Sequence, residues 1–228
     1  ESAVVMDSQR RKTLIKAVIF DMYETLVTHY ECPLYFSAEM AKDAGISEEN
    51  FRKMWRETET KRTIGKLSFE EVLERILKEN NSYSEEKLRY IVAKRIHTKE
   101  ELFCHLHKEI IPLLSALKER KIQIGLISNC FSEEAKVIKK SILYPYFDVP
   151  LLSYDEGLQK PDLEIFQRCL ERLQVFPQEC LYVGDGGNFE LEAAEKIGMK
   201  AVQAVWYVSQ RKAEFRQLES PLELLRLL

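Results

Sequence analysis

Residues 14–26 read LIKAVIFDMYETL, and the fold follows from this stretch. The run Ile15–Phe20 is apolar apart from Lys16, and Asp21 comes directly after it. A continuous apolar run of this length indicates a buried strand of a parallel sheet, because half-exposed strands alternate between apolar and polar residues. In open parallel sheets, ligands bind beyond the carboxyl ends of the strands. The residues that follow Phe20 are therefore the first candidates for chemistry.

Further apolar runs and helical patterns alternate along the rest of the chain. Strands are expected at 122–127, 149–152, 181–183 and 201–205. Helices are expected at 112–120, 132–140, 162–173 and 188–197, with a short terminal helix at 222–228. Alternating strands and helices predict an α/β fold, here a Rossmann-like three-layer core with a parallel sheet in the middle.

One long segment between the first two strands breaks this alternation. Ser68, Ser82 and Thr98 are each followed by Glu three residues later, a capping-box pattern that predicts the start of a helix. Apolar residues recur at helical spacing over 69–77, and no strand pattern is found nearby. The segment is therefore expected to be an all-helical insertion.

These patterns predict the domain organisation. Residues 33–105 are expected to form a helical cap, inserted into an α/β core made of 14–32 and 106–228. Residues 1–13 are expected to be a flexible arm or the remnant of a tag.

Composition excludes several classes of protein. The chain has 34 basic and 37 acidic residues, and this lack of a basic surplus disfavours nucleic-acid binding. No apolar run approaches the ~20 residues of a membrane helix, and the first ten residues lack the pattern of a signal peptide. A protein without nucleic-acid or membrane partners is expected, and composition says nothing about its oligomeric state.

The cysteines indicate a reduced, cytoplasmic protein. There are five, an odd number, and none forms a C-x-x-C pair. Cys104, His105 and His107, with His97 upstream, are the one compact group of soft metal ligands in the sequence. Because His105 and His107 stand two apart on an expected helix, they would point in different directions, so an ordinary polar surface is favoured over zinc.

Polar groups follow several of the expected strands. The strand at 122–127 is followed by Ser128-Asn129, the strand at 149–152 by Lys160, and the strand at 181–183 by a segment containing Asp185 and Glu190. Any one of these residues could be an ordinary turn or cap residue. Together with Asp21, however, they would meet at one edge of the sheet, and this joint placement predicts a functional site.

At these positions the sequence resembles the haloacid dehalogenase superfamily. The resemblance covers the chain from Leu14 onward, the motifs occur in the same order, and the helical insertion is similar to the helical cap of that family. The four motifs are Phe20-Asp21-x-Tyr23-x-Thr25-Leu26, Ser128-Asn129, Lys160-Pro161-Asp162 and Gly184-Asp185-Gly186-Gly187-x-x-Glu190.

The resemblance implies roles for the residues of the first three motifs. Asp21 would be a nucleophile that forms a covalent aspartyl intermediate, and a carboxylate suits this task because it is ionised at pH 7 without a base. Thr25 and Ser128, with Asn129 beside them, would hold the transferring phosphoryl group or the nucleophile. Lys160 would neutralise charge between the nucleophile and the phosphate.

The resemblance also implies a metal ion and a class of substrate. Mg²⁺ would be held by the side chains of Asp21 and Asp185 and by the main-chain carbonyl of Tyr23, an all-oxygen set suited to a hard ion. Glu190 would contribute directly or through a water molecule. Mg²⁺ is thus the expected cofactor, and a small phosphorylated metabolite is the expected substrate.

Tyr23 departs from the phosphatase pattern. Phosphatases of this family place a second aspartate two residues after the nucleophile, as a general acid and base, whereas tyrosine resembles the dehalogenase branch. A phenol with a pKa near ~10 can donate a proton but is a poor base for water. Glu24 is the adjacent acid, but on an extended segment its side chain is expected to point away from that of Tyr23.

Three functions are therefore weighed. Asp185 and Glu190 imply a cation, which favours a Mg²⁺-dependent phosphatase. The second is a 2-haloacid dehalogenase, whose halide would need a cationic group such as Arg52, Arg56 or Arg62. The third is a capped domain that binds a phosphorylated ligand without turnover. Metal dependence separates the first from the second, and turnover of an aryl phosphate separates the first from the third.

Overall fold

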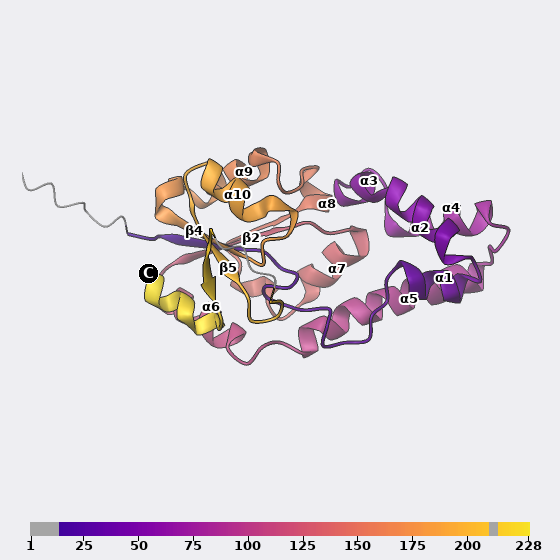
Figure 1. Ribbon diagram of the computed structural model, residues 1–228, viewed down its shortest axis with the longest axis horizontal. Coiled ribbons are helices and arrows are strands. Elements are labelled where there is room, and N and C mark those ends of the chain that lie inside the picture. Colours follow the sequence, from indigo (N-terminus) through magenta and orange to yellow (C-terminus); the bar gives the residue numbers. More distant parts are fainter. Residues whose placement is uncertain (1–13, 210–213) are drawn as a thin grey trace, which may run out of the picture.

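A parallel β-sheet organises the protein, as the computed structural model of residues 14–209 and 214–228 shows (Figure 1). The sheet has six strands in the order β3-β2-β1-β4-β5-β6, and every neighbouring pair is parallel. The strands are β1 (Ala17–Phe20), β2 (Gln123–Ser128), β3 (Val149–Leu152), β4 (Cys180–Gly184), β5 (Lys200–Ala204) and β6 (Arg216–Leu218). The first strand in the sequence thus lies at the centre of the sheet, next to β2 and β4.

Helices cover both faces of this sheet, which confirms the three-layer α/β core (Figure 1). One face is covered by α9 (Leu163–Leu173) and α10 (Glu190–Lys196), and the other by α6 (Ile110–Glu119) and α7 (Ser132–Lys140). The short helix α8 (Ser153–Glu156) follows β3, and a 3₁₀ helix, η5 (Pro221–Leu227), packs beside α6.

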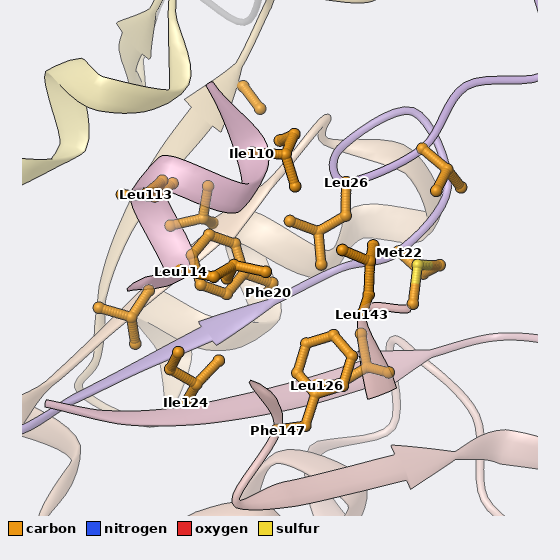
Figure 2. Packing of buried hydrophobic residues seen from close by; sticks show 14 of the residues in the cluster. Phe20, Met22, Leu26, Ile110, Leu113, Leu114, Ile124, Leu126, Leu143 and Phe147 are labelled. Atoms are coloured by element: carbon orange, nitrogen blue, oxygen red, sulfur yellow. The ribbon is translucent and has the colours of Figure 1, made fainter. Parts of the chain in front are cut away.

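Alternation along the strands divides the core into two apolar layers. In β1, Val18 and Phe20 join one cluster and Ala17 and Ile19 the other, and all four are completely buried. Figure 2 shows the first cluster, in which residues of α6 pack around Phe20. Each large apolar side chain buried in this way contributes about 1.5–3 kcal/mol. The carboxyl end of β1, where Asp21 lies, is therefore held in place from both faces.

The segment between β1 and β2 begins with five α-helices, α1–α5, that extend away from the sheet and form the cap (Figure 1). They have a separate apolar cluster, built around Met40, Phe51, Phe69 and Ile91. The helices are α1 (Ser37–Ala44), α2 (Glu48–Glu57), α3 (Glu59–Thr63), α4 (Phe69–Glu79) and α5 (Glu85–Glu101). We propose that 33–105 bounds this cap and that 14–32 and 106–228 form the core; residues 1–13, expected to be an arm or tag remnant, lie outside the described residues.

Two of the three expected helix starts in the cap are wrong in position. The Ser68 box caps α4 as expected, since Glu71 N–H donates to Ser68 Oγ. The next helix is capped by Ser84, not Ser82, because Ser84 Oγ accepts from Lys87 N–H. Thr98 begins no helix; it lies inside α5, where its hydroxyl donates to the Arg95 carbonyl.

Several elements of the core also differ from expectation. The helix expected at 188–197 begins only at Glu190, because Asn188 and Phe189 have positive φ angles of 51° and 52°. The terminal helix is a 3₁₀ helix, and β6 was not expected. His105 and His107 lie in a loop after a 3₁₀ turn, not on a helix as expected. His107 has an ordinary polar contact there, because its Nδ1 accepts from Glu109 N–H.

Within the described ranges, no helix combines the length and apolar character needed to cross a membrane.

Candidate active site

The carboxyl ends of β1, β2 and β4 lie side by side, because these three strands are neighbours in the sheet. Asp21 directly follows β1, Ser128 ends β2, and Asp185 directly follows β4. A cavity of about 460 Å³ opens at this edge, between the core and the cap. Its core walls are formed by Asp21, Tyr23, Glu24, His29, Asn129, Phe131, Glu134, Gln159, Lys160, Asp185, Gly187, Asn188 and Glu190, and its cap walls by Arg56, Glu59, Thr60 and Thr63.

Lys160 lies between two carboxylates at the centre of this site. Its Nζ donates to Asp21 Oδ1 at 2.6 Å and to Glu190 Oε2 at 2.6 Å. Asn129 fixes the backbone of Lys160, because its amide accepts from Lys160 N–H at 2.8 Å and donates to the Lys160 carbonyl at 3.0 Å. The second and third motifs are thus joined directly. Burial lowers the pKa of Lys160, but Asp21 and Glu190 outweigh burial and raise it, so the lysine is a fixed cation.

Three carboxylates form an acidic cluster around this lysine. One oxygen each of Asp21, Asp185 and Glu190 lies within 4.8 Å of the other two, the one such group of possible metal ligands among the described residues. Burial and then repulsion by Glu190 raise the pKa of Asp21 to about 8 and that of Asp185 to about 6. With only one ammonium group beside these carboxylates, Asp21 would be largely protonated at pH 7, contrary to the expectation that it is ionised. A divalent cation with oxygen ligands fits this excess of carboxylate and would restore the ionised form of Asp21.

Glu190 is already held by donors from the protein. Its Oε2 also accepts from Tyr182 OH at 2.7 Å, and its Oε1 accepts from Gly186 N–H at 3.1 Å. A Cβ atom on Gly184 would approach Glu190 Oε1 to 2.1 Å, so only glycine fits between the strand and this carboxylate. Tyr182 was missed by sequence reasoning; the signal was its position in a buried strand, where a phenol needs a hydrogen-bond partner. The geometry makes Glu190 a partner that positions Lys160.

Thr25 and Ser128 are fully buried and do not line the cavity. Thr25 Oγ1 donates to Asp21 Oδ2 at 3.4 Å, a long hydrogen bond to the expected nucleophile. Ser128 Oγ has no hydrogen-bond partner among the described residues. Leaving a buried hydroxyl unpaired costs about 1–3 kcal/mol, and a ligand oxygen at the end of β2 would remove this cost.

Glu24 does not point away from Tyr23, and the expectation from strand alternation is wrong. Glu24 has a φ of 59°, so the chain leaves the extended conformation and both side chains line the same cavity. Glu24 Oε2 accepts from Thr28 Oγ1 at 2.6 Å, and Glu24 Oε1 bonds His29 Nδ1 at 2.7 Å. Burial opposes ionisation, but these bonds outweigh it and lower the pKa of Glu24. Glu24 is therefore an ionised acid on the cavity wall.

Tyr23 has no hydrogen-bond partner for its phenol oxygen among the described residues. Its ring stacks on His29, with ring centroids 4.9 Å apart. Burial first, and then the charge of Glu134, raise the pKa of Tyr23 well above its usual range. The phenol is therefore neutral at pH 7 and cannot accept a proton from water.

A buried ionic network joins the cap to the core beside Tyr23. Lys99, on α5, contacts Glu134 Oε1 at 2.8 Å and His29 Nε2 at 2.7 Å. Because an ammonium group cannot accept, His29 Nε2 accepts and His29 Nδ1 carries the proton donated to Glu24. One turn before Lys99, Arg95 Nε donates to Glu133 Oε1 at 3.1 Å. Sequence reasoning missed this network, because each of its residues resembles a surface charge when seen alone.

The three cap arginines considered for an anion have different surroundings. Arg52 pairs with Glu48 on its own helix and does not line the cavity. Arg62 is completely buried, with its guanidinium 3.4 Å from the ring centroid of Trp55. Only Arg56 of the three lines the cavity.

Comparison with known proteins identifies the family. The model of the haloacid dehalogenase-like hydrolase family matches residues 15–198. The chain therefore belongs to the haloacid dehalogenase-like hydrolases.

Curated relatives include phosphatases. Glyceraldehyde 3-phosphate phosphatase of Methanopyrus kandleri is 25% identical over 224 residues, covering 90% of this chain and 88% of that protein. Phosphorylated carbohydrates phosphatase of Thermotoga maritima is 29% identical, covering 84% and 85%. Rhythmically expressed gene 2 protein of Drosophila melanogaster is 33% identical over 101 residues, 43% of this chain and 36% of that protein.

The fold of this chain is similar to solved structures from both branches of the family. A 2-haloacid dehalogenase of Pseudomonas syringae has a TM-score of 0.67 at 21% identity, covering 94% of this chain and 98% of that one. A family enzyme of Bacteroides thetaiotaomicron, in complex with magnesium and inorganic phosphate, has a TM-score of 0.67 at 20% identity, covering 89% and 100%. Because the two scores are equal, the fold does not separate phosphatase from dehalogenase, and the site must do so.

Proposed function

We propose that the chain is a Mg²⁺-dependent phosphatase of a small phosphorylated metabolite, acting through an aspartyl-phosphate on Asp21. The observation that carries this proposal is the acidic cluster of Asp21, Asp185 and Glu190, with Lys160 between two of its members. An excess of buried carboxylate calls for a divalent cation, and such a cation suits the transfer of an anionic phosphoryl group. The phosphatases among the curated relatives support the same conclusion.

The proposed hydrolysis has two steps, and the residues of the site have different roles in them. A carboxylate oxygen of Asp21 forms a bond to phosphorus while the bond from phosphorus to the ester oxygen breaks. The leaving alkoxide takes a proton from solvent water. In the second step the oxygen of a water molecule bonds to phosphorus, the bond from phosphorus to Asp21 breaks, and the proton of that water passes to solvent, which frees phosphate and the Asp21 carboxylate. Lys160 holds Asp21 in position, and Ser128 Oγ, which has no partner among the described residues, would need to turn toward the cavity to donate to a phosphoryl oxygen.

The expected metal ligands are the side chains of Asp21 and Asp185 and the main-chain oxygen of Tyr23. Glu190, whose oxygens already accept from protein donors, would take part through water. When bound, Mg²⁺ would reduce the repulsion between the carboxylate nucleophile and the phosphoryl oxygens.

The dehalogenase alternative is favoured by one observation, namely Tyr23 at the position that resembles that branch. Arg56 would be its cation for halide, since Arg52 and Arg62 do not line the cavity. The acidic cluster opposes this function, because attack on carbon gains nothing from a second and third carboxylate near the nucleophile. A binding domain without turnover would keep the cavity but hydrolyse nothing.

The test is hydrolysis of an aryl phosphate and of 2-haloacids, each with Mg²⁺ and with excess chelator. We expect Mg²⁺-dependent release of phosphate and no release of halide. Asp21→Asn should abolish turnover because an amide is a far poorer nucleophile. Asp155→Asn is the matched control, since Asp155 pairs with Lys139 away from the cavity. Full activity in chelator would refute the metal-dependent phosphatase, and halide release would establish the dehalogenase.

A further inference from the structure

The charges on the cavity wall leave one cation without a partner. Six carboxylates line the cavity, against two side chains that are always cationic, Lys160 and Arg56. Lys160 is held between Asp21 and Glu190. The side chain of Arg56 forms no hydrogen bond or ion pair with any residue that the structure describes. Among the described residues that line the cavity, Arg56 is thus the one arginine or lysine whose side chain has no partner and can bind a ligand.

The sequence of α2 explains why Arg56 is unpaired. Other cap arginines bond a glutamate four residues away on the same helix, as Arg75 does with Glu79 and Arg89 with Glu85. The positions four residues before and after Arg56 are Arg52 and Thr60, neither of which is an acid. Glu59, three residues after Arg56, also lines the cavity, but it lies beyond the end of α2 and forms no ion pair with Arg56 within the described chain. The guanidinium group of Arg56 is therefore unpaired at the cavity wall.

We propose that Arg56 binds a carboxylate on the leaving group of the substrate, so that the substrates are small phosphorylated carboxylic acids. This inference rests on the proposed phosphatase function. A guanidinium group matches a carboxylate with two parallel N–H···O bonds. Thr60, in the first turn of α3, also lines the cavity, and its hydroxyl forms no hydrogen bond within the described chain, so it can donate to the same carboxylate.

A carboxylate fits this wall better than the other groups a small phosphate ester could carry. A second phosphate would bring nearly two negative charges into a cavity already lined by six carboxylates, against a single free cation. A purely hydroxylated leaving group would leave the charge of Arg56 unmatched. A single carboxylate balances a single guanidinium.

The test compares two esters of similar size, 3-phosphoglycerate and glycerol 3-phosphate, which differ in whether a carboxylate is present. The measured quantity is the ratio of their kcat/KM values with Mg²⁺. We expect wild type to favour 3-phosphoglycerate and Arg56→Gln to lower this ratio about 10–100-fold, the range for losing a charge-assisted hydrogen bond. Arg56→Lys should retain part of the preference, because it keeps the charge but loses the paired geometry.

Arg52→Gln is the matched control, because Arg52 lies one turn away on α2, pairs with Glu48 and does not line the cavity. An unchanged ratio in Arg56→Gln, or an equal fall in Arg52→Gln, would overturn the inference. Wild type that hydrolyses an aryl phosphate but not 3-phosphoglycerate would overturn it while leaving the phosphatase function intact. Wild type that hydrolyses no phosphate ester would refute the phosphatase function itself.

Discussion

Tyr23 should limit the rate of the proposed phosphatase reaction. Its phenol is neutral and has no described hydrogen-bond partner, so it is a poor acceptor for a proton from water. Glu24, turned into the cavity, is engaged by Thr28 and His29. Neither side chain replaces the aspartate that phosphatases of this family carry at position 23. We therefore expect turnover to depend strongly on how easily the leaving group departs.

Tyr23→Asp should raise turnover of alkyl phosphates more than that of aryl phosphates. Alkoxides are strong bases that need a proton on leaving, whereas aryl oxides leave readily without one. The gain for the alkyl ester should fall within the ~10²–10⁴ range of general acid–base catalysis, and steady-state kinetics on one ester of each kind measures it. Tyr23→Phe removes only the phenol oxygen and should show no such gain. Equal wild-type rates on both esters would contradict this account of Tyr23.

The backbone conformation at Glu24 could not be predicted from the sequence. Asp21 and Asp185 could be placed from the sequence, because any residue directly after a central parallel strand reaches the same edge of the sheet. The direction of Glu24 could not, because one residue with a positive φ reverses the alternation on which the expectation rested. Arg56 could be named as a candidate, but its place on the cavity wall depends on how the cap packs against the core.

Helix α5 is the element that joins the cap to the core beside the candidate active site. Its last turns carry Arg95 and Lys99, which pair with carboxylates of α7 in the core. The side chain of Lys99 is only 4% exposed. A buried cation of this kind is costly to leave without its partner and equally costly for the partner to lose.

Lys99→Met should lower the free energy of unfolding by about 3–5 kcal/mol, because Glu134 would lose its closest cation while staying buried. Lys94→Met is the matched control on the same helix. Lys94 pairs with Asp43 at 2.7 Å but is 39% exposed, so its loss should cost no more than about 1 kcal/mol. Urea unfolding of both variants measures the difference. Equal losses would show that burial of the Lys99 pair adds nothing.

The helices and strands that were predicted correctly differ physically from those that were not. The central strands and α4 could be predicted because they depend on local apolar runs and a local cap. The box at Thr98 failed because the hydroxyl of a threonine inside a helix can bond the preceding turn instead, and here packing of α5 on α7 keeps the helix continuous. The three-residue β6 was missed because it is too short to show a period.

At the scale of the whole molecule, the proposed Mg²⁺ site would link metal binding to folding. Asp21 and Asp185 come together only when β1 and β4 pair, so Mg²⁺ should bind the folded chain and not the unfolded one. At a Mg²⁺ concentration ~100 times the Kd, this linkage adds about 2.7 kcal/mol. For a chain of this length, Tm should rise by roughly 5–10 °C. Thermal unfolding with Mg²⁺, and after excess chelator, measures the shift.

Asp185→Asn should remove most of this shift and should also raise Tm in chelator. The pKa of Asp185 is raised to about 6 in the folded protein, so its ionised form opposes folding at pH values above that, and pH 8 is the condition to use. An amide at this position carries no such charge. A variant that keeps the full Mg²⁺ shift would place the ion elsewhere.

The central position of β1 has a consequence for the order of events during synthesis. The ribosome makes β1 first, yet its neighbours β2 and β4 begin more than a hundred residues later along the chain. Until then a completely apolar strand has both edges open, and the helices of the cap emerge while it waits. Nascent chains that end before β4 should therefore bind chaperones or aggregate, whereas chains that extend past α10 should not. The segment that carries the proposed nucleophile is thus made before its neighbouring strands and remains exposed until they arrive.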